Sequence, residues 1–253
     1  YSENQEYQRS ITFYKKALDY NPGFSGARIS MARSLSAIGQ TLQAVSEFSF
    51  AASGDRRKVI GYFEAAQLQT INRRYQEAES LVSKLIEATP NFPGAHRLLS
   101  QIYQFSAKNT EAIAEMVTEV ENNPQNTKFL IELGELYMKY QKQQEAIVVL
   151  AKITHLPDEK LAPEFRVDRT KAFLLLSRCY RFLKRPDNAE SAIRLAMEID
   201  YNDPELHREL GYVFNDLQRY REGVKEFEIY LQRNPAGVDA ENIKKLIKVM
   251  AIE

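Results

Sequence analysis

The residues of this 253-residue chain that most often carry chemistry are three histidines and a single cysteine. Histidine and cysteine hold zinc or act as bases and nucleophiles, and a zinc site needs several of them at suitable spacings. The histidines are His96, His155 and His207, and Cys179 has no second cysteine with which to form a disulfide or a thiolate cluster. Histidines spaced in this way are typical of structural or surface roles, so we expect no metal site.

The remaining chemical groups form no catalytic pattern either. The 10 glycines are scattered singly, so no glycine-rich loop could hold a phosphate. The 34 acidic residues are spread along the chain, and no pair is set apart for acid–base catalysis. We therefore predict a protein that is not an enzyme and that needs no cofactor.

The overall charge gives a further restriction. Lysine plus arginine and aspartate plus glutamate both number 34, so the net charge is zero. This balance argues against broad attraction to nucleic acid or to an anionic membrane. No apolar run approaches the roughly 18 residues of a membrane span, and no signal peptide opens the chain. The sequence leaves both the compartment and the oligomeric state open.

A small residue recurs along the chain at a nearly constant interval. The interval is 34 residues, apart from one of 43, and the residues are Ser10, Ala44, Ala78, Ala112, Ala146, Ala189 and Gly223. A fixed period of this length is the signature of a solenoid built from stacked repeats. With the small residue numbered as position 20, the chain divides into a half repeat at 1–24, six repeats at 25–58, 59–92, 93–126, 127–160, 170–203 and 204–237, an insertion at 161–169 and a last helix at 238–253.

Each repeat has the pattern of a helical hairpin. Apolar residues at positions 4, 7 and 11 would line one helix, and those at positions 17, 20, 24 and 27 would line the next. Small residues at positions 8 and 20 would let the two backbones approach closely. Proline at position 32 ends the second helix, as at Pro22, Pro90, Pro124 and Pro235.

This pattern resembles the tetratricopeptide repeat, a helix-turn-helix unit of 34 residues. The segment from Glu6 to Pro22 is similar to the second helix of that family, and the resemblance extends from about Glu3 to Gly237. It implies an all-α, right-handed superhelical solenoid. The chain departs from the family at position 4, where the family favours tryptophan and this sequence has Arg28, Tyr62, His96, Leu130, Phe173 and His207.

Two segments interrupt the regular pattern. The extra residues around 157–169 are interpreted as a turn insertion followed by a longer first helix, from about Glu164 to Leu183; a loop that contacts a partner is the alternative. At the C-terminus we expect a capping helix over 238–253, with Asp239 as its N-cap and Ile243, Leu246, Ile247 and Met250 as its apolar stripe. The half repeat at the start lacks a first helix, which suggests a fragment or a mature form.

The resemblance implies that the first helices line a concave groove through positions 2, 5, 9, 12 and 13. Eight of the thirty residues at these positions are basic and three are acidic, which suggests an extended acidic peptide or partner protein as the ligand. The predicted partner-binding residues are Arg33, Phe63, Gln67, Arg97, Gln101, Gln104, Phe105, Lys128, Met138, Lys171, Arg178 and Arg181.

The leading hypothesis is therefore a non-catalytic scaffold for protein–protein interactions. The lysine and asparagine pattern with which chaperone adaptors of the family hold a C-terminal carboxylate is absent, because position 5 never carries lysine and position 9 never carries asparagine. Helical repeats that read RNA carry basic grooves, which the neutral charge disfavours. Two alternatives remain: an assembly module of a larger envelope or secretion complex, and a regulatory domain of an enzyme whose catalytic part lies outside this chain.

Overall fold

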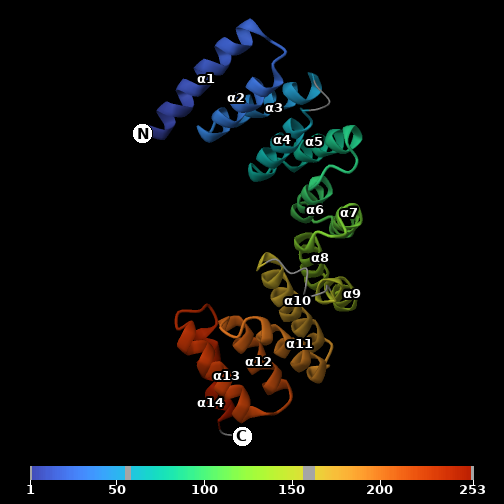
Figure 1. Cartoon of the computed structure of the whole chain (residues 1–253), viewed down its shortest axis with the longest axis vertical. Coiled ribbons are helices and arrows are strands. Elements are labelled where there is room, and N and C mark those ends of the chain that lie inside the picture. Colours follow the sequence, from blue (N-terminus) through green and yellow to red (C-terminus); the bar gives the residue numbers. More distant parts are fainter. Residues whose placement is uncertain (1, 55–57, 156–162, 252–253) are drawn as a thin grey trace. The chain divides into compact units, whose positions relative to one another are not determined.

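The computed structural model describes residues 2–54, 58–155 and 163–251 (Figure 1). In these ranges the chain forms α-helices joined by short turns, and no strand. The helices form two compact units, unit 1 from Tyr1 to Asn123 and unit 2 from Pro124 to Glu253. The structure confirms the predicted all-α fold of helical hairpins.

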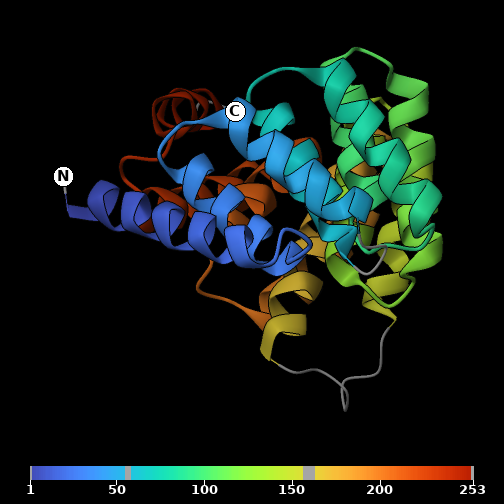
Figure 2. The ribbon, with the colours of Figure 1, turned by 90° about the horizontal axis from the view of Figure 1, so that it is seen from above.

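Unit 1 contains one leading helix and three hairpins. In each hairpin the first helix packs on the second, as α6 does on α7, and both views of the ribbon show these two helices as neighbours (Figure 1, Figure 2). The helices are α1 (Ser2–Tyr20), α2 (Ser25–Ala37), α3 (Thr41–Gly54), α4 (Ile60–Ile71), α5 (Tyr75–Ala88), α6 (Ala95–Phe105) and α7 (Asn109–Asn122).

Unit 2 contains three hairpins and a final helix. Asp203 caps α12, since its carboxylate accepts a hydrogen bond from the backbone N–H of Glu205 at 2.8 Å. The helices are α8 (Thr127–Lys139), α9 (Gln143–Thr154), α10 (Pro163–Phe182), α11 (Pro186–Ile199), α12 (Pro204–Asp216), α13 (Tyr220–Arg233) and α14 (Ala240–Met250).

The small residues lie where the two helices of a hairpin come closest. A Cβ atom added to Gly211 at position 8 would lie 2.6 Å from the ring of Phe227 at position 24, and one added to Gly134 would lie 2.8 Å from Leu150. The alanines at position 20 are 0% exposed in all five repeats that carry one. This packing confirms why the sequence keeps positions 8 and 20 small.

The turn inside each hairpin has the same backbone conformation at position 15. The residue there has a positive φ, and the next N–H donates to the carbonyl five residues back, as in the bond from Lys108 N to Tyr103 O at 2.9 Å. This is the Schellman arrangement, in which a left-handed residue ends a helix. Only one of the six residues at this position is a glycine. The six are Gly39, Arg73, Ala107, Gln141, Lys184 and Gln218.

The predicted insertion lies partly outside the described residues, because residues 156–162 are not among them. From Pro163 the chain is helical, and α10 has 20 residues where α8 and α12 have 13 each. The long helix predicted from about Glu164 to Leu183 is thus confirmed. The partner-contacting loop at 157–162 stays a prediction.

The last helix, α14, covers the end of unit 2 as expected. Ile243 and Met250 are buried against Phe227 and Tyr230. Asp239 is the N-cap residue as predicted, but its side chain makes no capping hydrogen bond and instead pairs with Arg208. The strong charge of the guanidinium outcompetes the partly exposed N–H groups of the helix end. Among the described residues, no helix is long and apolar enough to cross a membrane.

Candidate partner-binding faces

A hollow of about 500 Å³ opens on the first helices of unit 1, between α2 and α4. It brings together three predicted binding residues, Arg33, Phe63 and Gln67. Its apolar lining includes Ile71, which is 78% exposed at the end of α4. An exposed isoleucine beside a hollow of this size marks a surface on which an apolar group could be buried.

The two phenylalanines predicted for this face differ in role. Phe63 is half-buried and packs against Phe92, with ring centroids 5.3 Å apart, so part of it belongs to the core. Phe105 is 62% exposed, and its ring stacks on Tyr75 at 5.4 Å with an interplanar angle of 11°. Of the two predicted binding residues, Phe105 is therefore exposed at the surface, whereas Phe63 partly fills the gap between α4 and the turn before α6.

The cation of this hollow already has a partner. Arg33 forms an ion pair and hydrogen bonds with Glu64, which lies 31 residues further along the chain. The hydrogen bond with Glu64 raises the pKa of Arg33 above its ordinary value. Any ligand carboxylate at this point would have to share the guanidinium with Glu64.

The other predicted residues of unit 1 lie on α6. The buried carboxylate of Glu119, from α7, accepts hydrogen bonds from the backbone N–H groups of Gly94 at 2.9 Å and Arg97 at 3.1 Å. A carboxylate at the positive end of a helix stabilises it, and here it replaces the missing N-cap side chain. The Arg97 side chain is half-buried, as are Gln101 and Gln104.

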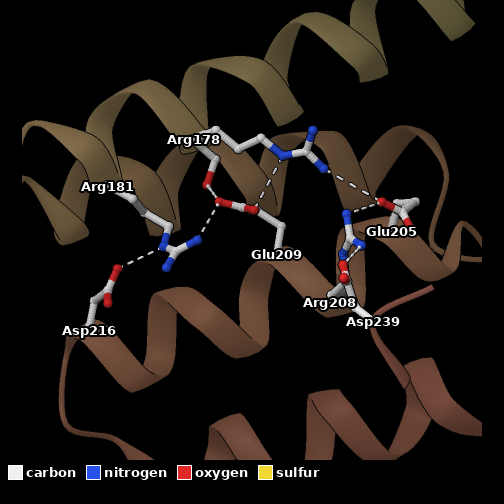
Figure 3. Close-up of polar contacts among 8 residues, drawn as sticks. Arg178, Arg181, Glu205, Arg208, Glu209, Asp216 and Asp239 are labelled. Atoms are coloured by element: carbon white, nitrogen blue, oxygen red, sulfur yellow. Dashed lines mark hydrogen bonds and ion pairs between the residues drawn. The ribbon is translucent and has the colours of Figure 1, made fainter. Parts of the chain in front are cut away.

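In unit 2 the predicted cations belong to a network of ion pairs (Figure 3). The buried carboxylate of Glu209 lies between Arg178 at 3.4 Å and Arg181 at 3.3 Å, and Arg181 also pairs with Asp216 at 2.7 Å. Burial alone would lower the pKa of Arg181, but the hydrogen bond with Asp216 and the charge of Glu209 outweigh it and raise that pKa. These pairs join α10 to α12.

Two further cations of this face are paired in the same way. Arg208 lies between Glu205 and Asp239, as Figure 3 shows. Lys171 on α10 pairs with Glu135 on α8 at 2.8 Å. The basic excess read from the groove positions is thus largely balanced by acidic partners.

Two of these partners, Glu64 and Glu209, were not among the predicted groove residues because they lie at position 6. A basic residue at position 9 pairs with a glutamate at position 6 of the next repeat, 31 residues later, in Arg33–Glu64 and in Arg178–Glu209. The signal was present in the sequence as this 31-residue spacing. Of the remaining predicted residues, Lys128 is exposed and Met138 is half-buried on α8.

A second hollow, of about 570 Å³, lies on unit 2 and is lined by Lys171 and Arg178 among others. Five of the twelve predicted binding residues therefore gather in two hollows, each within one unit, and the other seven line neither hollow. Arg33, Phe63 and Gln67 meet on unit 1, and Lys171 and Arg178 meet on unit 2.

The histidines and the cysteine that could carry chemistry have structural contacts. His96 pairs with Glu115, His207 with Glu226, and the backbone carbonyl of Ala151 lies 2.6 Å from Nδ1 of His155. Burial raises the pKa of the Cys179 thiol to about 12, so the reactive thiolate is scarce near neutral pH. In the described ranges, no group of three or more His, Cys, Asp or Glu side chains could hold a metal ion.

Comparison with known proteins agrees with this architecture. The family model for the tetratricopeptide repeat matches residues 170–203. Residues 170–203 therefore form a tetratricopeptide repeat, and the other hairpins share its helix–turn–helix architecture. No curated protein sequence matches it.

Several solved tetratricopeptide-repeat structures share the fold. The C-terminal part of a TPR repeat-containing protein from Cytophaga hutchinsonii is 12% identical with a TM-score of 0.72, over 95% of each chain. YrrB, described as a TPR protein with an unusual peptide-binding site, is 17% identical with a TM-score of 0.59, over 78% of this chain and 97% of its own. Pseudomonas aeruginosa PilF is 17% identical with a TM-score of 0.58, over 78% of this chain and 89% of its own.

Proposed function

We propose that this protein is a non-catalytic scaffold that binds an extended peptide segment of a partner protein on its first helices. The observation that carries the proposal is the hollow between α2 and α4, with its exposed Ile71 and its glutamine and arginine at the rim. The apolar lining suits one side chain of the ligand, and Gln67 suits the peptide backbone, because its amide both donates and accepts.

The rigid helical framework supports this use. The hollow is lined by residues of packed helices, so little ordering of the receptor accompanies binding. The neighbour YrrB is described as having a peptide-binding site, and a similar use of the fold here is part of the proposal.

An acidic peptide remains the proposed ligand on unit 1, with its carboxylate beside Arg33. Because Glu64 shares that guanidinium, we expect the charge to add selectivity rather than most of the affinity. A peptide whose glutamate is replaced by glutamine should then bind a few-fold more weakly, and the difference should shrink at high salt.

The proposal can be tested with random 12-residue peptides selected by display on the wild-type chain. Their affinities are then measured for Ile71→Glu and for the matched control Leu42→Glu, a leucine of α3 that is 63% exposed and lies outside the hollow. The proposal predicts a group of peptides that lose at least tenfold in affinity with Ile71→Glu and keep it with Leu42→Glu. If no selected peptide distinguishes the two variants, the proposal is wrong.

The two alternatives from the sequence also stay proposals. An assembly module would bury this face in a stable oligomer, and a regulatory domain would contact a catalytic part elsewhere in a longer protein. Neither has an observation among the described residues that favours it over peptide binding.

A further inference from the structure

The hollow on unit 2 differs from that on unit 1 because an extension of α10 forms part of its wall. Arg166 and Val167 lie in the two turns of α10 that precede Thr170, where the predicted 34-residue repeat begins. Neither α8 nor α12 has a comparable extension, since each has 13 residues against the 20 of α10. The extra residues of the chain thus build a surface that a regular repeat lacks.

The floor of this hollow is apolar. Val167, Leu174 and Ile199 contribute to it, and Val167 is 68% exposed in the middle of the extension. A valine this exposed on a regular helix adds nothing to the core of unit 2. A side chain that enters the hollow would bury Val167, and removing this apolar surface from water favours binding.

The rim of the hollow is divided by charge. The cations stand on the α10 wall, at Arg166, Lys171 and Arg178, while the opposite wall carries Asp200, Asp203 and Glu205. The guanidinium of Arg166 donates to the backbone carbonyl of Ile199 at 3.3 Å, and within the described residues it has no carboxylate partner. Lys171 already pairs with Glu135, and Arg178 pairs with Glu209 and, across the hollow, with Glu205. Among the described residues Arg166 on one wall and Asp200 and Asp203 on the other have no ion pair, so they offer opposite charges to whatever lies between them.

We propose that this hollow binds a peptide segment in which a leucine-sized side chain stands between one acidic and one basic residue. The apolar side chain fills the floor, the acidic neighbour pairs with the α10 wall, and the basic neighbour pairs with the 200–205 wall. This inference rests on the proposed function, because it names the peptide chemistry for a second face of the same scaffold. It also gives the residues inserted before Thr170 a role in choosing the ligand.

Charge complementarity of this kind discriminates between ligands more than it adds affinity. A peptide with two acidic neighbours would meet Asp200 and Asp203, and one with two basic neighbours would meet Arg166 and Lys171. Each carries one unfavourable contact, so both should bind more weakly than the mixed peptide.

The first experiment measures fluorescence polarisation of labelled nine-residue peptides with the full chain. All share a serine-rich frame. Those with a central leucine have as its two neighbours Glu and Lys in either order, two Glu, or two Lys, and the control has Glu and Lys around a central alanine. The better mixed peptide should bind at least threefold tighter than both single-sign peptides and at least tenfold tighter than the alanine peptide. Equal affinities across the series, or no binding, would overturn the inference.

The second experiment compares Val167→Glu with Val148→Glu, an exposed valine of α9 in the same unit and outside the hollow. Both side chains are exposed, at 68% and 59%, so neither change should lower the melting temperature. Val167→Glu should weaken the mixed peptide at least tenfold, and Val148→Glu should leave it unchanged. Equal effects of the two variants would place the peptide elsewhere and refute the inference.

The unit 1 variants separate this inference from the proposed function. Ile71→Glu should leave the mixed peptide unaffected, since Ile71 lies in the other unit. If the mixed peptide fails while the displayed peptides still depend on Ile71, the inference alone is wrong. If both sets fail, the proposed function is wrong as well.

Discussion

Nδ1 of His207 lies 2.6 Å from a carboxylate oxygen of Glu226, which stands 19 residues further along the chain. The same spacing joins Arg28 to Glu47 at 2.7 Å, and His96 to Glu115 at 2.7 Å. In the predicted register these are positions 4 and 23, on the two helices of one hairpin. In the other three repeats both positions are apolar: Tyr62 with Leu81, Leu130 with Val149, and Phe173 with Ala192.

The two positions therefore change together, from a polar pair to an apolar pair. A buried polar group is costly without a partner, whereas an apolar pair of similar shape can replace both partners at little cost. This relationship explains how the chain does without the tryptophan that the family favours at position 4.

A double-mutant cycle at His96 and Glu115 tests that relationship. His96→Leu alone leaves the half-buried Glu115 carboxylate without its partner and should lower the free energy of unfolding by about 1–3 kcal/mol. His96→Leu with Glu115→Val recreates the Leu130–Val149 pair and should recover most of that loss. Urea denaturation of the four proteins gives the coupling, and a double variant as unstable as the sum of the two singles would refute the pairing rule.

The left-handed residues at position 15 predict a route to higher stability. Ala107 has a φ of 57°, a conformation that costs an L-residue about 1–2 kcal/mol and costs glycine little. Ala107→Gly should raise the free energy of unfolding by about 0.5–1 kcal/mol, after the greater freedom of unfolded glycine is taken into account. The control Ala114→Gly, in the interior of α7, should lower it by about 1 kcal/mol. Thermal denaturation distinguishes the two, and a loss of stability in Ala107→Gly would contradict the prediction.

The close approach of Phe227 to Gly211 predicts that a methyl group added at Gly211 lowers the stability of the protein. A methyl group there would lie 2.6 Å from the buried ring of Phe227, which has no room to withdraw. Gly211→Ala should therefore destabilise the protein by about 1–3 kcal/mol. Gly54→Ala is the control, because no atom lies within 4 Å of the added group. Chemical denaturation should show a loss only for Gly211→Ala, and unchanged stability in that variant would mean that α12 and α13 are more loosely packed than described.

The sequence predicted the helices of this protein better than the contacts between its charged side chains. The positions of the helices followed from the 34-residue spacing, because small residues at positions 8 and 20 and large ones at position 24 have only one compact arrangement. The ion pairs were not predicted from the sequence. Glu209 lies at a position that was not expected to face the groove, and only the packing of α12 on α10 brings it next to Arg178 and Arg181. Asp239 was taken as a cap because its type and place suit that role, and only the structure places Arg208 near enough to claim its carboxylate.

Cys179 gives a prediction about pH. Its side chain is 0% exposed, and burial raises the pKa of the thiol to about 12. The folded state therefore favours the protonated thiol, whose contribution to stability is complete below the unfolded pKa of about 8.5 and is lost as the pH rises toward 12. Cys179→Ala should show a smaller decline in the free energy of unfolding over this range. A thiol reagent at pH 8 should modify the unfolded chain and leave the folded chain intact; rapid modification of the folded chain would contradict the assigned burial.

The proposed function requires that a peptide binds on the first helices of unit 1. The most direct measurement is photo-crosslinking of a display-selected peptide to chains carrying a photoreactive residue at Gln67, in the hollow, or at Gln76, an exposed residue of α5 outside it. We expect an adduct from position 67 that unlabelled peptide competes away, and none from position 76. Crosslinking from position 76 alone, or equally from both, would show that the peptide does not lie in the hollow between α2 and α4.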